Sequence, residues 1–382
     1  MKTNKMCAIL GNVTRFQELL PLTENRPLDT LPFDCKYRLI DFPLSSIANA
    51  NVHSIFMIFN EGETRSVFDH IGGGREWHLD SLQNRYFVYF YQDFIKEKAQ
   101  GLPYYASIID YLEKSESEYT VFMGSNMLCT IDLNAVLKTH QSHNNPITVV
   151  YKKMEDAHLS KEDALLQIDE NGHVEEIYKK NPDSKEIRAL NLSMNIYIIQ
   201  TNWLIEQLSI GQQQDSPINL NEFFRERISD VQTTAHEYTG YLSNIIDVAS
   251  YYQANMDMLD EKKFRALMYA KQKVYTKRRN EVPTYYSAES SVKNSQCATG
   301  CIIEGKLENS LVSRRTVIKK GAKIKDSILM SNAKVAENAV IEYAILDKNV
   351  IVDAGVRIVG TKGKPIVIQK NQIVSADVIR EV

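Results

Sequence analysis

The chain has 382 residues, more than one ordinary hydrophobic core holds, so we expect two domains. Its composition, with 43% apolar and 24% charged residues, is typical of globular proteins. A formal net charge of −3 provides no basic surplus, so a general nucleic-acid-binding surface is not supported. No run of residues approaches the length of a membrane span, and we expect no membrane partner.

The five cysteines lack paired spacing, and the first residues lack the apolar stretch of a secretion signal. Both observations predict a cytoplasmic protein with reduced thiols. Cys297 and Cys301 lie four residues apart, but no second Cys or His pair follows them. Small buried side chains are therefore favoured over half of a metal site.

The first part of the chain alternates short apolar, β-branched segments with polar segments of helical composition. The expected strands are at 7–11 (CAILG), 54–59 (SIFMIF), 119–124 (YTVFMG) and 146–153 (PITVVYKK). This alternation predicts a parallel sheet with crossover helices.

The next segments add a hairpin, a further strand and a long helix. The hairpin is expected from 165–169 and 173–178 around the turn ENG, and the strand from 192–199 (LSMNIYII). Residues 247–270 have apolar side chains at helical spacing and neither Pro nor Gly, so they predict one long helix joining two domains.

Two segments rich in aromatic or basic residues have a structural and a functional interpretation. The aromatic run 85–94 (RYFVYFYQDF) could stack on a base, but a strand or helix packed in the core is favoured. The basic run 277–279 (KRR) is a candidate effector site, although a solvated surface is the commoner role of such a run.

After about residue 290 a six-residue periodicity replaces helical spacing. It is typical of a hexapeptide β-helix, in which the periodic residue points into the core, and we expect about three coils. Ordinary antiparallel strands are the weaker alternative. The periodic positions, with two one-residue slips, are Val312, Ile318, Ile324, Met330, Val335, Ile341, Asp347, Val352 and Ile358.

The segment 121–132 (VFMGSNMLCTID) predicts a buried strand that ends in a tight loop. In nucleotide-handling α/β proteins an acidic metal ligand tends to lie at such a strand end. Here the strand is followed by Gly124, Ser125 and Asn126, and no carboxylate occurs before Asp132. The strand at 7–11 ends at Gly11, where a glycine would allow close approach to a phosphate.

Several long motifs, in the same order, resemble those of the sugar-nucleotide pyrophosphorylases, most closely the ADP-glucose pyrophosphorylase (glucose-1-phosphate adenylyltransferase) family. They are PLTENR, LPFDCKYRLIDFPLSSIANANV, SVFDHIGGGREW, LSMNIYII and ASYYQANMDML. The resemblance implies an α/β fold, with a Rossmann-like nucleotidyltransferase domain (mixed, mostly parallel sheet) followed by a left-handed parallel β-helix. The expected boundaries are 1–247 for the first domain, 248–290 for a helical connector and 291–382 for the β-helix.

Enzymes of this family join glucose 1-phosphate to ATP by in-line attack on the α-phosphorus, with Mg²⁺ held by two Asp residues. Those two Asp positions correspond here to Ser125 and Asn244, and the family's triphosphate-binding Lys corresponds to Leu28. Of the Gly-rich loop only Gly11 and Arg15 remain, and the assignment of Arg15 is loose because an insertion separates it from PLTENR. Mg²⁺ prefers anionic oxygen ligands, so the resemblance implies a lost metal site.

The sugar and nucleobase motifs are partly retained. The family's sugar-phosphate Lys corresponds to Lys180 and its sugar-contacting Ser to Ser193. The nucleobase motif GTADA appears as GLPYY, in which only Gly101 matches. A sugar-phosphate ligand is therefore possible in a remnant pocket.

The resemblance implies a non-catalytic or weakly catalytic regulatory subunit in glycogen synthesis, paired in a heterotetramer with a catalytic glucose-1-phosphate adenylyltransferase subunit. No cofactor is expected, and Mg²⁺ and ATP are expected only if the site still works. The alternatives are an active enzyme whose metal site is rebuilt from Asp132 and Asp247, and a sugar-phosphate sensor. A hexapeptide acyltransferase is disfavoured because residues 290–382 contain no His.

Overall fold

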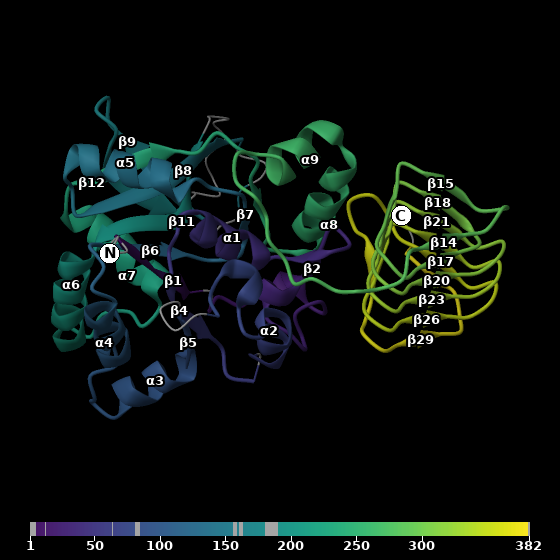
Figure 1. The fold of residues 1–382 in the computed structure, drawn as a ribbon, viewed down its shortest axis with the longest axis horizontal. Helices are drawn as coiled ribbons and strands as arrows, with labels where there is room; N and C mark the ends of the chain where they lie inside the picture. Colours follow the sequence, from purple (N-terminus) through teal and green to yellow (C-terminus); the bar gives the residue numbers. More distant parts are fainter. Residues whose placement is uncertain are drawn as a thin grey trace. The chain divides into compact units, whose positions relative to one another are not determined.

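A computed structural model describes residues 5–11, 13–62, 64–80, 85–155, 159, 163–179 and 190–380 (Figure 1). The chain forms two compact units. Unit 1 comprises Met1–Thr14, Ile40–Asn244 and Ala270–Tyr275, and unit 2 comprises Arg15–Leu39, Ile245–Tyr269 and Thr276–Val382. The first chain segment is thus divided: β1 belongs to unit 1, whereas the PLTENR motif belongs to unit 2.

Unit 1 contains a nine-stranded mixed sheet in the order β5-β4-β1-β6-β11-β8-β12-β10-β9. β5, β4, β1 and β6 run parallel, while β11 is antiparallel to both β6 and β8. The expected hairpin forms between β9 and β10. The strands are β1 (Met6–Gly11), β4 (Ser54–Phe59), β5 (Arg85–Phe90), β6 (Tyr119–Met123), β8 (Ile147–Met154), β9 (Ala164–Ile168), β10 (His173–Lys179), β11 (Leu190–Gln200) and β12 (Thr233–Glu237).

Helices pack on both faces of this sheet, because its central strands are apolar on both sides. On β1, Ala8 and Leu10 join one apolar cluster, whereas Cys7 and Ile9 join the other, as the two-residue period of a strand requires. The helices of unit 1 are α1 (Asp41–Asn49), α2 (Thr64–Ile71), α3 (Tyr91–Ala99), α4 (Ala106–Ser115), α5 (Leu133–His143), α6 (Thr201–Gln213), α7 (Leu220–Asp230) and the 3₁₀ turn η3 (Arg75–Trp77). The aromatic run at 85–94 forms β5 and the start of α3.

The end of unit 2 is a left-handed β-helix built of three parallel sheets (Figure 1). The sheets contain β14 (Tyr285–Tyr286), β17 (Ile302–Ile303), β20 (Val317–Ile318), β23 (Lys334–Val335), β26 (Ile351–Val352) and β29 (Ile373–Val374); β15 (Ser291–Lys293), β18 (Lys306–Glu308), β21 (Lys323–Lys325), β24 (Val340–Glu342), β27 (Arg357–Val359) and β30 (Val378–Ile379); and β16 (Gln296–Cys297), β19 (Leu311–Val312), β22 (Ile328–Leu329), β25 (Ala344–Leu346) and β28 (Ile366–Ile368).

The six-residue periodicity is confirmed, since each of its nine positions is at most 2% exposed. The expected number of about three coils was too small, because the sheets hold six, six and five strands. A corner insertion interrupts the six-residue spacing, so the spacing does not extend to the later coils. Residues 360–365 separate β27 from β28 and form a small hairpin closed by a Thr361–Lys364 bridge. The β25–β28 pairing beyond it stays in register, with Ile345 opposite Val367.

The single long helix expected at 247–270 is wrong, because the segment forms α8 (Val248–Met256), the turn η5 (Asp257–Leu259) and α9 (Glu261–Met268). The Asp260 side chain accepts hydrogen bonds from the backbone N–H groups of Lys262 and Lys263, so it starts a new helix. Asp247 likewise begins α8 through a capping box with Ser250. Such side-chain caps compete with helix continuation, and apolar spacing alone does not reveal them.

Within unit 2, α8 and the segment 15–39 pack against the β-helix. Tyr252 donates its hydroxyl to the carbonyl of Asp326 (2.6 Å), and Gln296 donates its amide to the carbonyl of Met258 (2.9 Å). Outward-facing residues of the third sheet, such as Ile328 and Ile345, are consequently buried. The short elements of segment 15–39 are η1 (Gln17–Leu19), η2 (Leu28–Thr30), β2 (Pro32–Phe33) and β3 (Tyr37–Arg38).

A buried ion pair also joins this segment to the β-helix. Asp347 occupies a periodic core position at 2% exposure, and its carboxylate accepts from the guanidinium of Arg26, which is 5% exposed. Burial, together with the nearby cations Arg38 and Arg26, lowers the pKa of Lys348 to about 7. Asp347 therefore lies close to several cationic side chains, and its carboxylate offsets part of their charge.

We expect Asp347→Ala to lower the free energy of unfolding by about 3–5 kcal/mol, because it leaves Arg26 buried without its counter-charge. The double variant Arg26→Met/Asp347→Ala removes both charges and should recover part of this loss. Urea unfolding of the three proteins measures the difference. Equal losses in the single and double variants would contradict a role for charge pairing.

In unit 1, His140 of α5 is 1% exposed, and its Nδ1 lies 2.8 Å from Thr148 Oγ1. Burial lowers the pKa of His140 to about 4, so the folded state holds a neutral imidazole. In the unfolded chain the His140 imidazole takes up a proton as the pH falls below about 6.5, whereas in the folded chain it stays neutral until a lower pH. The stabilising contribution is therefore complete above the unfolded pKa and is lost as the pH falls towards the folded pKa.

We expect unfolding in urea to become easier between about pH 6.5 and pH 4, with about 2 kcal/mol of the loss due to His140. The variant His140→Gln keeps a polar group beside Thr148 but cannot take up the proton, so its stability should fall less over this range. An identical pH profile for the two proteins would exclude His140 as the source.

Candidate functional site

The two positions that the sequence resemblance assigns to metal ligands lie close together in unit 1. Ser125 lies in the loop between β6 and β7 (Met127–Leu128), and Asn244 ends β13 (Ser243–Asn244). β7 and β13 pair antiparallel, with Asn244 opposite Met127. Asn126 donates its side-chain amide to Asn244 Oδ1 at 3.1 Å. The chain thus keeps the geometry that brings the two positions to one place.

A carboxylate does reach this place, but it belongs to Asp163. The side-chain nitrogen of Asn244 lies 2.9 Å from Asp163 Oδ1 and 3.0 Å from Oδ2, so both oxygens accept from one amide. Asp163 is 6% exposed and Asn244 is 7% exposed. Only the NH₂ end of an Asn can donate to a carboxylate, so this contact fixes the orientation of the amide.

This arrangement is poorly suited to Mg²⁺. The ion needs several oxygen ligands, and here both oxygens of Asp163 accept from a hydrogen-bond donor. Within the described ranges no group of three His, Cys, Asp or Glu side chains could hold a metal ion, and this includes the neighbourhood of Cys297 and Cys301. An Asp at position 244 would instead place a second carboxylate against Asp163, which is the arrangement a divalent cation favours.

Sequence reasoning missed Asp163. It stands directly before β9, and the sequence offers no local feature that distinguishes it from other acidic residues at strand ends. Its partner Asn244 is 81 residues further along the chain, so only the tertiary structure brings the two together. The motif positions Ser125 and Asn244 lead to this place in the fold, but they do not predict that Asp163 contributes its carboxylate there.

The two acids considered as replacement ligands are both helix caps. Asp132 accepts from the backbone N–H groups of Asn134 (3.1 Å) and Ala135 (3.2 Å) at the start of α5. Asp247 accepts from Ser250 N (2.6 Å) at the start of α8. Each carboxylate therefore has a local structural role, and a rebuilt metal site would compete with it.

The remnants of the phosphate-binding loop have local explanations. A Cβ on Gly11 would lie 2.6 Å from the Phe122 ring, so packing alone requires glycine there. Leu28 lies in η2 of unit 2 at 5% exposure, and its buried side chain supplies no charge. Arg15 also belongs to unit 2 and is exposed.

The positions of the nucleobase motif carry buried tyrosines. Gly101 follows α3 with φ +70°, where glycine is favoured. Tyr104 and Tyr105 are 3% and 0% exposed, and their hydroxyls donate to backbone carbonyls at 211–217. These tyrosines fasten the α3–α4 loop to the α6–α7 region, which is a structural role.

The sugar-motif serine is enclosed. Ser193 is 0% exposed, and its Oγ accepts from the backbone N–H of Asn195 (3.3 Å) at a bulge in β11. Asn195 has φ +51°, and its Oδ1 accepts from Arg225 (3.2 Å). Lys180, the other sugar-phosphate candidate, lies outside the described residues. The basic run 277–279 belongs to unit 2, and its role as an effector site stays a prediction.

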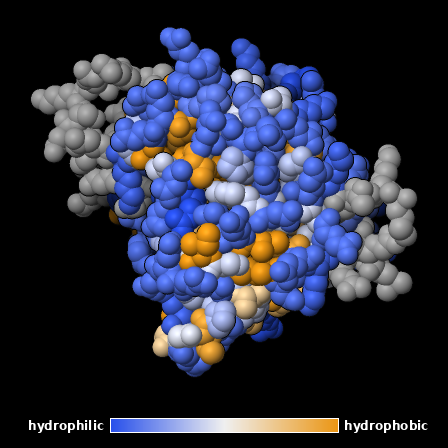
Figure 2. Space-filling view, turned by 90° about the vertical axis from the view of Figure 1, so that its left-hand side faces the viewer, coloured by the Kyte–Doolittle hydropathy of each residue, from blue (hydrophilic) through white to orange (hydrophobic). Residues whose placement is uncertain are grey.

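The surface gives a limited indication of partners. On the face that carries α4 and α6, hydrophilic side chains interrupt the apolar areas (Figure 2). Among the residues that the structure describes, no helix combines the length and the hydropathy needed to cross a bilayer.

Comparison with known proteins agrees with the two parts of the fold. Residues 11–261 match the nucleotidyl transferase family model, and residues 282–364 match the model of the GlmU-like C-terminal hexapeptide. The glycogen biosynthesis protein GlgD of Bacillus subtilis is 28% identical over 375 residues, covering 98% of both chains.

Two further relatives have comparable coverage. The glycogen biosynthesis protein GlgD of Geobacillus stearothermophilus is 30% identical over 322 residues, covering 84% of this chain and 82% of that protein. The glucose-1-phosphate adenylyltransferase of Clostridium perfringens strain SM101 is 27% identical over 374 residues, covering 94% and 93%. The chain is therefore similar over nearly its whole length to proteins of both names.

The geometry at Asn244 makes the effect of a restored carboxylate predictable. Without a cation, Asn244→Asp places two buried carboxylates in contact and should destabilise unit 1 by about 2–4 kcal/mol at neutral pH. Mg²⁺ should reverse much of this loss, because the cation supplies the missing counter-charge. Thermal unfolding with and without MgCl₂ measures the effect.

Asn244→Ala is the matched control. It also removes the hydrogen bond to Asp163, but it adds no charge, so its melting temperature should not respond to Mg²⁺. The interpretation fails if Asn244→Asp is as stable as the natural chain in EDTA, or if both variants respond equally to Mg²⁺.

Proposed function

Because the chain belongs to the nucleotidyl transferase family, we propose that it serves glycogen synthesis as a regulatory partner of a catalytic glucose-1-phosphate adenylyltransferase, with little or no activity of its own. Full-length similarity both to GlgD proteins and to glucose-1-phosphate adenylyltransferases supports the assignment to this process. The proposed loss of activity rests on the hydrogen bond that Asn244 donates to Asp163, at the position that the resemblance assigns to a metal ligand.

The chemistry explains why this substitution matters. Phosphoryl transfer from ATP relies on positioning and on neutralising negative charge, and Mg²⁺ supplies much of both. The chain offers an amide at 244, a buried serine hydroxyl at 125 and a buried leucine at 28 where the reaction needs two carboxylates and a cation. Nothing at these three positions offsets the charge of a triphosphate.

We assign the regulatory effect to contacts with the partner in a heterotetramer. A chain without chemistry of its own changes a partner's rate only if it binds two states of that partner with different affinity. A coupling free energy of about 1–3 kcal/mol corresponds to roughly 5- to 150-fold. The cysteines Cys7, Cys35, Cys129, Cys297 and Cys301 are all free thiols, which supports action in the reducing cytoplasm.

The test is pyrophosphate release from ATP and glucose 1-phosphate with Mg²⁺. We expect no turnover by the pure chain, and a changed rate or effector response when it is mixed with the catalytic adenylyltransferase from the same organism. The change in response should titrate with the amount of added chain. A chain that leaves the catalytic enzyme's rate and effector response unaltered is not its regulator.

Clear turnover by the pure chain would contradict the proposed loss of chemistry. Asp132→Asn then decides whether the site has been rebuilt. Asn caps a helix about as well as Asp does, so the variant keeps the start of α5 and can be assayed as a folded protein. Abolished turnover in that variant would identify Asp132 as a recruited ligand.

A further inference from the structure

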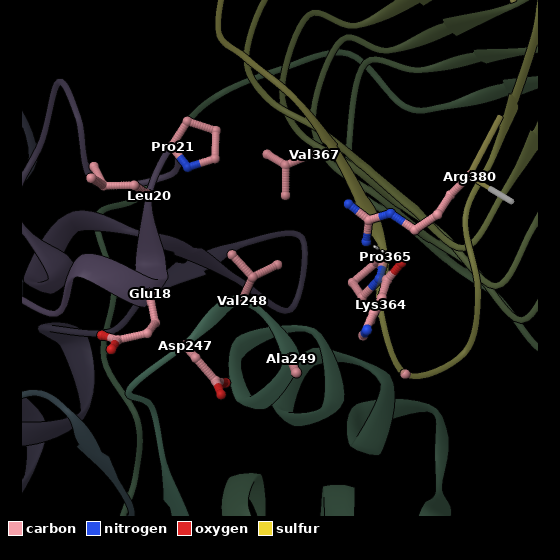
Figure 3. Close-up of a pocket in the computed structure, with 11 residues that line it drawn as sticks. Glu18, Leu20, Pro21, Asp247, Val248, Ala249, Lys364, Pro365, Val367 and Arg380 are labelled. Carbon is pink, nitrogen blue, oxygen red and sulfur yellow. Dashed lines mark hydrogen bonds between the residues drawn. The ribbon is translucent and has the colours of Figure 1, made fainter. Parts of the chain in front are cut away.

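Unit 2 contains a cavity of about 350 Å³ that none of the motifs explains (Figure 3). Three segments of unit 2 line it: the start of PLTENR, the beginning of α8 and the last coils of the β-helix. Its volume suits a small ligand. The lining residues used below are Glu18, Pro21, Asp247, Val248, Lys364, Val367 and Arg380.

One wall of the cavity is cationic. Arg380 Nη1 donates to the carbonyl oxygen of Lys364 at 2.9 Å, which ties the arginine to the corner insertion at 360–365. In Figure 3 the guanidinium points towards the gap. Neither side chain forms an ion pair with any residue in the part of the chain that the structure describes. Two positive charges therefore face the cavity without a counter-charge.

The opposite wall is acidic. Glu18, in η1, makes no ion pair within the described ranges, and Asp247 lies next to it in the lining (Figure 3). Asp247 Oδ1 caps α8, which leaves its second oxygen able to accept another hydrogen bond. The two acids are not paired with the two cations across the cavity, although pairing would offset all four charges.

Apolar side chains separate the two walls. Val248 lies between the acidic and the cationic ends in Figure 3, and Pro21 and Val367 complete the apolar part of the lining. A ligand that fills the cavity would meet a positive end, an apolar middle and a negative end in succession. This order selects for charge distribution as well as size.

We propose that this cavity binds a compact bipolar molecule. Its anionic group, a carboxylate or a phosphate, lies between Lys364 and Arg380. Its hydrogen-bond donors, an ammonium or hydroxyls, reach Glu18 and Asp247. A molecule with anionic groups at both ends is repelled by the acidic wall, and a purely apolar molecule displaces water from the four charged groups without offering them a hydrogen-bond partner.

Such a ligand bridges three separate segments of unit 2. Glu18 stands eight residues before Arg26, Asp247 stands three residues after Asn244, and Lys364 belongs to the corner insertion. Binding would therefore stabilise the packing of segment 15–39 and α8 against the β-helix. The inference concerns binding by the pure chain, so it stands or falls separately from the proposed regulatory function.

Isothermal titration of the full chain is the test, with two bipolar probes at millimolar concentration. L-Leucine carries an ammonium group and glycerol 3-phosphate carries hydroxyls. Comparing the two affinities shows which kind of hydrogen-bond donor the acidic wall prefers. Inorganic phosphate, glycerol and succinate are the controls for an anion alone, donors alone and two anionic ends. We expect one bipolar probe to bind more tightly than all three controls.

Variants locate the binding. Arg380→Gln and Glu18→Gln change exposed side chains and should leave the melting temperature unaltered while weakening the bipolar probe at least about tenfold, since each loses a charged hydrogen-bond partner. Lys362→Gln, on the same corner insertion but outside the lining, should bind like the natural chain. The proposal is overturned if neither bipolar probe binds, if inorganic phosphate binds equally well, or if the variants do not weaken binding.

Discussion

A buried carboxylate must be neutralised or hydrogen bonded, and this constraint shapes both units of the molecule. In unit 1 the Asn244 amide donates a hydrogen bond to Asp163, and in unit 2 the Arg26 guanidinium forms an ion pair with Asp347. The first contact lies where the sequence resemblance places a metal ligand. The second contact joins segment 15–39 to the β-helix. Each contact joins parts of the chain that are far apart in sequence, so each is a property of the fold rather than of a motif.

Asn and Asp have nearly the same shape, so the local architecture at position 244 does not depend on which of the two is present. The amide has the shape of a carboxylate but replaces one acceptor with a donor. In this chain the donor meets Asp163, so the buried group stays satisfied without any metal. A larger replacement would have disturbed the β7–β13 pairing. The fold is therefore compatible with a role based on surfaces and interfaces.

Much of the fold follows from local periodicity, and the failures occurred where side chains override it. The β-helix core is predictable because its inward positions recur every six residues with only two one-residue slips. The helix at 247–270 was misjudged because Asp260 caps a new helix, an effect of one side chain on two backbone groups. The candidate site was only half predictable: alignment of motifs located Ser125 and Asn244, but Asp163 carries no signal in its own segment.

The corner insertion at 360–365 shows how the β-helix separates its scaffold from its variable parts. The coil register continues beyond it, with Ile345 opposite Val367, so the insertion leaves the pairing of the stacked strands unchanged. Lys364, carried by that insertion, can thus be altered or replaced without repacking a strand. Homologous chains can exchange such corners as independent modules, and diversity among relatives should accumulate there while the triangular core remains unchanged.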